Sequence, residues 1–325
     1  MSKNKIHSTV LLMSAALLLT IVAPIAAGSM IAMPIEIPAL TADLIGVVEI
    51  TEVSEATNEK IQLPHLSKPR KCWHKIYTAT ITKKDLYANR NKALEKAPEK
   101  DKPITFKFIA STYNPKGPRI CIPMPEFKVG DKVCVMLVKS KNLKHLYLPT
   151  YYQNYRRNDK DAKAFKKAAE IKIHWSKANK EGIQIGVALK TNKLTVGLND
   201  NVTVSAFVLI KNTSDKVVGI CNYPSDNCFS ANYIADDKKT YPINVKHRNA
   251  GTDFNQYFIT LLQPGQARVF STKAFPGAIK GTFKATKGEK VKVQFTFKNS
   301  RKAKRDKINA WVGELTTPAV EVEIK

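Results

Sequence analysis

The sequence predicts a mainly β protein, with a small Greek-key barrel, a linking helix and then a β-sandwich. The clearest observation is strict alternation of apolar and polar residues within residues 182–214. Two runs carry it: Ile183, Ile185, Val187 and Leu189, then Val202, Val204, Ala206, Val208 and Ile210. Such a period of two places one face of a strand in a core and the other in water. Gly197 and the Asn199–Asp200 pair supply turn conformations between the runs. Similar short segments recur along the chain, which favours an all-β architecture.

Length and charge limit the function classes. A chain of 325 residues is long enough for two domains of about 100–150 residues each. Its 53 Lys and Arg residues against 27 Asp and Glu give a net charge of +26. Such a field attracts polyanions, which include nucleic acid, anionic glycans and acidic membrane surfaces. The alternative is a soluble basic protein whose lysines only cover polar strand faces, as Lys107, Lys132, Lys292 and Lys298 would.

The N-terminus predicts export. Lys3 and Lys5 precede an uncharged apolar stretch, Thr9–Ile25, and Ala26-Ala27-Gly28 then offers small residues for a signal peptidase. Residues 1–28 are therefore predicted to be a Sec-type signal peptide that is cleaved after Ala27 or Gly28. An uncleaved anchor is the alternative, because the apolar character continues to Met33 and about 20 residues suffice for a span. Both predictions place the rest of the chain in the periplasm, at the cell surface or outside the cell.

Residues 40–150 form the first predicted domain. After a proline-spaced lead at 34–40, five strand-like segments follow, at 42–53, 72–83, 104–110, 133–138 and 145–148. Residues 55–71 and 86–102 are polar or charged and are expected to form loops. Five short antiparallel strands over this length are typical of a small Greek-key barrel of the OB type. The segment ADLI from Ala42 and F-x-V-G-D-K-V-x-V-x-L from Phe127 resemble OB or netrin-like barrels of secreted bacterial proteins. The resemblance implies a fold and no activity.

Residues 151–174 are predicted to link the domains through a helix. Asn158 or Asp159 can cap this helix, which is expected to run toward Ile173 with one small and apolar packing face. An aromatic patch and two arginines precede it: Tyr151, Tyr152, Tyr155, Arg156 and Arg157. The tyrosines could stack on bases or sugar rings while the arginines bind anions. Alternatively, the tyrosines pack between the domains.

Residues 175–325 form the second predicted domain. Further strand-like segments follow the opening pair, at 217–220, 230–235, 256–262, 267–270, 291–297 and 320–324. Roughly seven strands with regular turn spacing fit an immunoglobulin-like sandwich. Three segments resemble immunoglobulin-like domains at the C-terminal end of exported bacterial proteins: W-x6-G-I-x-I-G-V at 175–187, L-x-P-G-Q at 262–266 and WVGELTTPAVEVEI at 311–324. The Cys…Trp…Cys signature of antibody domains is absent, so the resemblance implies architecture alone.

Five cysteines are present, an odd number that cannot all pair within the chain. Cys221 and Cys228 bracket a polar loop rich in turn formers, and in an exported protein they could form a disulfide across it. Among Cys72, Cys121 and Cys134 one pair and one remaining thiol are expected, with the pairing left open.

No catalytic motif is found. The sequence lacks H-E-x-x-H, G-x-S-x-G, a phosphate-binding glycine loop and C-x-x-C. Cys72 and His74 share one strand face, about 7 Å apart along the strand, but a metal site would need further ligands that nothing places there. The prediction is a protein without cofactor or metal, and not an enzyme.

The remaining basic feature is the loop after Asn299. Five cations gather there within seven residues: Arg301, Lys302, Lys304, Arg305 and Lys307. Such a loop can bind anions, although a charged run often is only a solvated loop. The resulting hypothesis is an exported, non-catalytic binding or structural protein of the cell envelope, with a basic surface for an anionic envelope polymer.

Three alternatives stay open. One is a secreted peptidase inhibitor or enzyme accessory module, with the 221–228 loop as its reactive segment. Another is a structural component of a surface layer. A protein partner or a membrane surface could also take the place of the envelope polymer. Export argues against nucleic acid, because the target would have to lie outside the cell.

Overall fold

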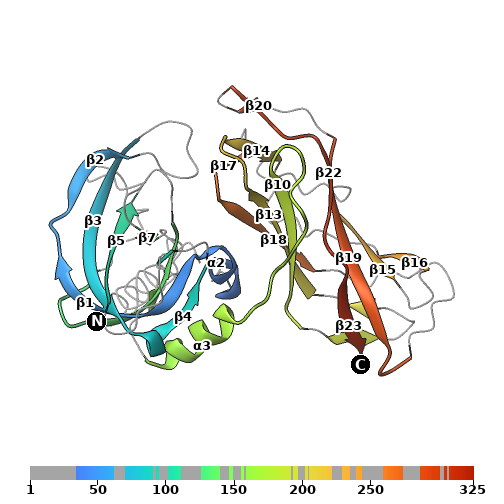
Figure 1. Ribbon diagram of the computed structural model, residues 1–325, viewed down its shortest axis with the longest axis horizontal. Coiled ribbons are helices and arrows are strands. Elements are labelled where there is room, and N and C mark those ends of the chain that lie inside the picture. The colour runs from blue at the N-terminus through green and yellow to red at the C-terminus, as the bar shows by residue number, and fades with distance from the viewer. Residues whose placement is uncertain are drawn as a thin grey trace, which may run out of the picture. The chain divides into compact units, whose positions relative to one another are not determined.

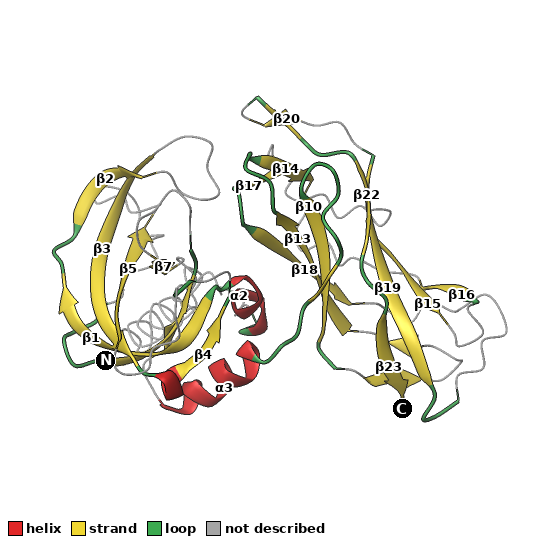
Figure 2. Cartoon of the chain, viewed as in Figure 1, coloured by secondary structure: helices red, strands yellow, loops and turns green. Residues whose placement is uncertain are grey.

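The fold is mainly β (Figures 1 and 2). The computed structural model describes residues 34–61, 70–90, 93–94, 102–110, 126–139, 146–148, 155–156, 159–191, 193–196, 202–203, 205–221, 229–234, 239–243, 259–273, 286–300, 304–305 and 307–325. The predicted signal peptide lies outside these residues. In the described part of the chain, neither α-helix has the length and apolar content that a membrane span requires.

The first sheet contains eight strands: β1 (Leu44–Val53), β2 (Thr57–Ile61), β3 (Arg70–Ile81), β4 (Leu86–Asn89), β5 (Lys102–Ala110), β6 (Lys132–Leu137), β7 (Leu146–Leu148) and β8 (Tyr155–Arg156). Six of them follow the order β7-β5-β3-β1-β6-β8, while β2 pairs with β3 and β4 pairs with β1. The β5–β7 pair is parallel. An antiparallel bridge between Val138 and Tyr147 joins the end of β6 to β7. The sheet therefore curls into a half-barrel.

Strand β1 is buried on both faces near its start, which explains its almost continuous apolar sequence. Leu44 and Val48 point into the inner core of the half-barrel, where Tyr77 stacks on Phe106 with ring centroids 5.3 Å apart. Ile45 points the opposite way, into a second cluster with Cys134, Met136, Phe165 and Ala168. A strand buried on both faces loses the period of two and reads as an apolar run.

Two helices lie on the outer side of this sheet. Helix α3 (Asp159–Ala169) contributes Phe165 and Ala168 to the outer cluster and contacts β1, β4 and β6. The predicted start is confirmed, but the helix ends at Ala169, before Ile173. The apolar face of the predicted linking helix thus packs on the first sheet. Helix α2 (Glu36–Thr41) contacts α3 and adds Ala39 to the same cluster. Residues 34–40 were expected to be a proline-spaced lead, because Pro34 and Pro38 obscure a short helix.

The later residues form two larger sheets. A four-stranded sheet has the order β18 (Ala267–Lys273), β13 (Ser205–Asn212), β10 (Ile183–Leu189) and β9 (His174–Trp175). A seven-stranded sheet has the order β12 (Val202–Thr203), β11 (Lys193–Val196), β23 (Val320–Ile324), β19 (Lys290–Asn299), β15 (Phe229–Ile234) and β16 (Thr240–Ile243), with β22 (Gly313–Thr316) on β19. Smaller sheets pair β14 (Val218–Cys221) with β17 (Ile259–Leu262), and β20 (Lys304–Arg305) with β21 (Ile308–Asn309).

One core joins the two larger sheets into a sandwich-like arrangement. It takes Ile185 and Val208 from the four-stranded sheet and Tyr233, Val293 and Phe295 from the seven-stranded sheet. Strand β19 alternates without exception from Lys290 to Asn299, with each second residue buried. Strand β19 therefore shows the packing pattern of a sandwich strand. Strands β10 and β13, whose alternation predicted the sandwich, are instead buried on both faces, because Ala188, Phe207 and Leu209 belong to a second cluster.

The predicted strand at 202–210 is wrong in one respect. Residues Val202–Thr203 pair with β11, whereas Ser205–Asn212 pair with β10 and β18. The segment therefore contributes one strand to each of the two larger sheets. Strands β2, β4 and β16 were not predicted. Four of the five β2 residues are exposed, so this edge strand carries no apolar alternation that could have signalled it.

Candidate anion-binding site

Part of the predicted basic loop is a β-hairpin. Strand β20 pairs antiparallel with β21, with Lys304 opposite Asn309 and Arg305 opposite Ile308. Lys307 lies in the turn between the two strands. Lys304 and Lys307 are exposed. The hairpin thus presents cationic residues at its tip.

The base of this hairpin is anchored in a small apolar cluster. Ile308 packs against Ile259, Leu261 and Ala310. Ala310 also forms a parallel bridge with Gly219 of β14. The base of the hairpin is therefore packed against the β14–β17 sheet.

Lys307 has an unusual backbone conformation. Its φ of 70° makes it the one non-glycine residue with positive φ among those that the structure describes. Side chains in this left-handed region cost about 1–2 kcal/mol, and such strain is concentrated at functional sites. A glycine would be favoured here on conformational grounds, yet the position carries an exposed cation.

Several predicted site residues lie outside the described residues: Arg301, Lys302, Arg157, Tyr151, Tyr152 and Cys228. Arg305 lies on strand β20 and Cys221 lies on strand β14, and the structure describes only their backbone. The anion-binding, aromatic-patch and disulfide assignments of these residues stay predictions.

Tyr155 and Arg156 lie on β8, which pairs with β6. The Tyr155 ring packs edge-on against Phe127, with centroids 5.3 Å apart, and contacts the inner core of the half-barrel. Arg156 Nη1 donates a hydrogen bond of 2.8 Å to the Tyr155 carbonyl. Both side chains are half-buried. Tyr155 therefore has a packing role, and β8 lies on a different sheet from the basic hairpin.

The lysines of β19 have acidic neighbours. Lys290 Nζ lies 2.9 Å from Glu321, and Lys298 Nζ lies 3.8 Å from Glu314. The hydrogen bond that Lys290 donates to the Glu321 carboxylate raises the pKa of Lys290. Because carboxylates offset these charges locally, this face offers a partner less net charge than the hairpin does.

Helix α3 presents a second basic surface. Lys163, Lys166 and Lys167 are exposed on the side opposite Phe165, and none of them forms an ion pair with another described residue. Lys166 and Lys167 lie in the last turn, where cations interact favourably with the helix dipole. Their position has this structural explanation, so the hairpin is the stronger candidate.

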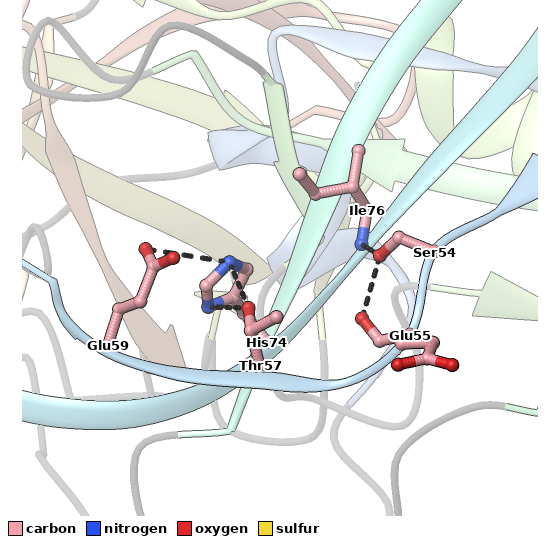
Figure 3. Close-up of polar contacts among 6 residues, drawn as sticks. All are labelled: Ser54, Glu55, Thr57, Glu59, His74 and Ile76. Carbon is pink, nitrogen blue, oxygen red and sulfur yellow. Dashed lines mark hydrogen bonds and ion pairs between the residues drawn. The ribbon is translucent and has the colours of Figure 1, made fainter.

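A buried histidine lies on the first sheet (Figure 3). His74 of β3 is 3% exposed and lies opposite Thr57 of β2. Thr57 Oγ1 lies 2.9 Å from His74 Nε2, and Glu59 Oε2 lies 3.9 Å from the same nitrogen. Cys72 is also buried on this strand face, as the sequence indicated. Below this pair, the Ile76 amide donates a 2.9 Å hydrogen bond to Ser54 Oγ.

This arrangement differs from a catalytic triad. A triad needs the carboxylate on one imidazole nitrogen and the hydroxyl on the other. Here Thr57 and Glu59 both approach Nε2. Among the described residues, no group of three His, Cys, Asp or Glu side chains is arranged to hold a metal ion. The His74 contacts are best understood as ties between β2 and β3.

Burial lowers the pKa of His74 below 6.5, and Lys107 lowers it further, while Glu59 and a hydrogen bond with the Cys72 backbone oppose the shift. The neutral imidazole is therefore favoured in the folded state. Its contribution to stability is complete above pH 6.5 and is lost as the pH falls through the folded pKa.

We expect the melting temperature of the protein to fall between about pH 7.5 and 5.5, and His74→Gln to reduce that fall. His174→Gln is the comparison variant, because burial and the charge of Lys172 also lower the pKa of His174. Thermal melts of wild type, His74→Gln and His174→Gln across this range measure the effect. A pH dependence unchanged in His74→Gln would show that His74 does not titrate with folding.

Comparison with protein-family models finds no match, and neither does comparison with curated proteins.

Proposed function

We propose that this protein is an exported, non-catalytic binding protein of the cell envelope. Its basic hairpin, Lys304–Asn309, would present cations to an anionic envelope polymer. The observation that carries the proposal is the left-handed conformation of Lys307 at the tip of an anchored hairpin. Ordinary loop chemistry favours glycine at such a position, so a strained lysine there favours a use for its charge.

The charge of the whole chain supports the same proposal. A net charge of +26 attracts a polyanion over long distances, and local cations then determine where it binds. A polymer with repeated negative charges fits this better than a small anion, because many weak contacts add along its length. An acidic membrane surface and an acidic protein are the competing partners.

We also propose the finer fold assignments. The strand order β7-β5-β3-β1-β6, with the Val138–Tyr147 bridge between its ends, supports an OB or netrin-like barrel. The two sheets around one alternating core support an immunoglobulin-like sandwich. Both scaffolds commonly present loops for binding, although a fold alone gives no function.

Charge reversal tests the hairpin directly. The variant Lys304→Glu/Arg305→Glu/Lys307→Glu should lower the affinity for polygalacturonate and for polyphosphate by at least about tenfold, because three attractions of up to about 1 kcal/mol each become repulsions. A matched control, Lys177→Glu/Lys216→Glu/Lys287→Glu, changes the net charge equally at exposed positions elsewhere. It should change the affinity by less than about threefold.

Binding can be measured by titration calorimetry at low salt. Equal losses in the two variants would mean that the charge acts diffusely and that the hairpin is no site. No loss in either variant would remove the basic surface from the function.

A further inference from the structure

The outer face of the four-stranded sheet is apolar and buried. The inner face of this sheet, which includes Ile185 and Val208, packs against the seven-stranded sheet. On the outer face lie Ala188, Phe207 and Leu209, and all three side chains are fully buried. A sandwich needs only the inner face of each sheet for its core. Elements outside the sandwich must therefore cover the outer face.

Helix α2 supplies part of this cover. Leu40, which is 4% exposed, belongs to the same apolar cluster as the three residues of the sheet, and Ile37 packs against that cluster. Helix α2 also contacts β18, the edge strand of the four-stranded sheet. Further cover comes from Ile171 and Ile173, which lie between α3 and β9. Two short segments that belong to no strand thus pack on the outer face.

The opposite side of α2 packs on the first sheet. Ala39 is fully buried in the outer cluster of that sheet, and Ile35, directly before α2, packs against the same cluster. Ile35 and Ala39 are four residues apart and lie on one side of the helical turn. Ile37 and Leu40 are three apart and lie on the other side. A surface helix normally buries one apolar side, whereas α2 buries two, each against a different sheet.

The two attachments of α2 differ in kind. On the first sheet, packing is reinforced by the Arg90 guanidinium, which donates to the carbonyls of Ala39, Ala42 and Ala169 and so holds the end of α2 to the end of α3. The attachment to the four-stranded sheet is apolar packing. Because α2 belongs to no sheet, this packing can open while every strand pairing stays intact.

We propose that α2 is a strap that holds the four-stranded sheet to the first sheet, with Ala39 packed on the first sheet and with Ile37 and Leu40 packed on the four-stranded sheet. Release of Ile37 and Leu40 uncovers the apolar outer face and leaves residues 170–173 as the covalent connection between the two sheets. The strap therefore determines whether the two sheets stay together. This inference does not rest on the proposed function, because the strap and the basic hairpin are different elements.

Small-angle X-ray scattering of the protein in solution tests the strap. Leu40→Asp places a carboxylate in the apolar cluster, and the strap opens because an unpaired charge is costly to bury. The radius of gyration should rise by about 10% or more, since two bodies on a short link form a longer particle than a compact chain. The matched control is Pro34→Asp, which adds the same charge at an exposed position just before α2. It should leave the radius of gyration unchanged.

Trypsin cleavage after Lys172 gives a second readout. Lys172 is exposed, but its neighbours Ile171 and Ile173 pack on the outer face of the four-stranded sheet, so cleavage requires these contacts to open. The cleavage rate at this bond, followed by mass spectrometry, should be at least about tenfold higher in Leu40→Asp, because the loss of a buried leucine shifts the opening equilibrium by at least that factor.

Circular dichroism shows whether each variant is folded. A folded Leu40→Asp variant with the wild-type radius of gyration and the wild-type cleavage rate at Lys172 would overturn the inference. Equal changes in Pro34→Asp would also overturn it, because they would reflect the added charge alone. If Leu40→Asp does not fold, Leu40→Ala decides the question. It should show both effects to a smaller extent, and wild-type values in that variant would mean that α2 is no strap.

Discussion

Replacing Arg90 with methionine should lower the free energy of unfolding by about 3–5 kcal/mol. The guanidinium of Arg90 donates from Nη1 to the Ala39 and Ala42 carbonyls and from Nη2 to the Ala169 carbonyl, the last at 3.1 Å. Ala39 and Ala42 lie at the end of α2, and Ala169 is the last residue of α3. The Arg90 side chain therefore joins both helices to the residue that directly follows β4.

The charge of Arg90 is also balanced within this cluster. Burial lowers the pKa of Arg90, and Asp43 opposes that shift. Asp43 is 7% exposed, and its carboxylate accepts a 2.7 Å hydrogen bond from the Lys139 amide. Removal of the guanidinium leaves a buried carboxylate without its neighbouring cation and leaves helix carbonyls without donors.

Urea denaturation at pH 7 measures the effect. The control is Arg90→Lys, which keeps the charge but cannot donate in three directions, so its loss should be intermediate. A free energy of unfolding for Arg90→Met within about 0.5 kcal/mol of the wild-type value would contradict the role of Arg90 as a tie between the helices.

Asn212→Ala should cost about 2–3 kcal/mol, the second-largest expected loss of stability. Asn212 is fully buried, and its Nδ2 donates to the Lys216 carbonyl at 2.7 Å and the Leu262 carbonyl at 2.8 Å. Its Oδ1 accepts from the amide and the hydroxyl of Ser214. The amide side chain thus joins the end of β13 to the turn that follows and to the end of β17.

The matched control is Ser214→Ala, which removes a single hydroxyl from this network. It should cost about 1 kcal/mol, because Asn212 keeps its other partners. Chemical denaturation of both variants tests the difference. Equal losses would indicate that the turn, rather than the buried amide, provides the stability.

The sequence predicted strands that carry a regular set of buried apolar residues. The predicted strand Val320–Ile324 agrees with β23 at both ends, and β19 was found by its alternation. Strand β10 was also found by alternation, although it is buried on both faces. Strand β2 was missed because four of its five residues are exposed, so only its pairing with β3 makes it a strand. Local patterns report burial and cannot report pairing at an exposed edge.

The candidate site was predicted in composition but not in conformation. The run of cations was visible, but nothing in it indicated the left-handed conformation of Lys307. The packing of Ile308 depends on Ile259 and Leu261 of β17, which lie 49 and 47 residues earlier in the chain. Arg90 gave no signal at all, because its partners are backbone carbonyls, which any residue type provides. His74 shares a face with Cys72 as predicted, but its contact with Thr57 was hidden because residues 55–71 were assigned to a loop.

A salt series of polyanion binding tests the central claim most directly. If three cations of the hairpin contact the polymer, the affinity of the wild-type protein for polygalacturonate should fall about 20- to 40-fold between 50 and 200 mM salt. The variant Lys304→Glu/Arg305→Glu/Lys307→Glu should bind weakly with a much smaller salt dependence. Wild type and variant with the same affinity and the same dependence on salt would contradict a role for the hairpin in binding.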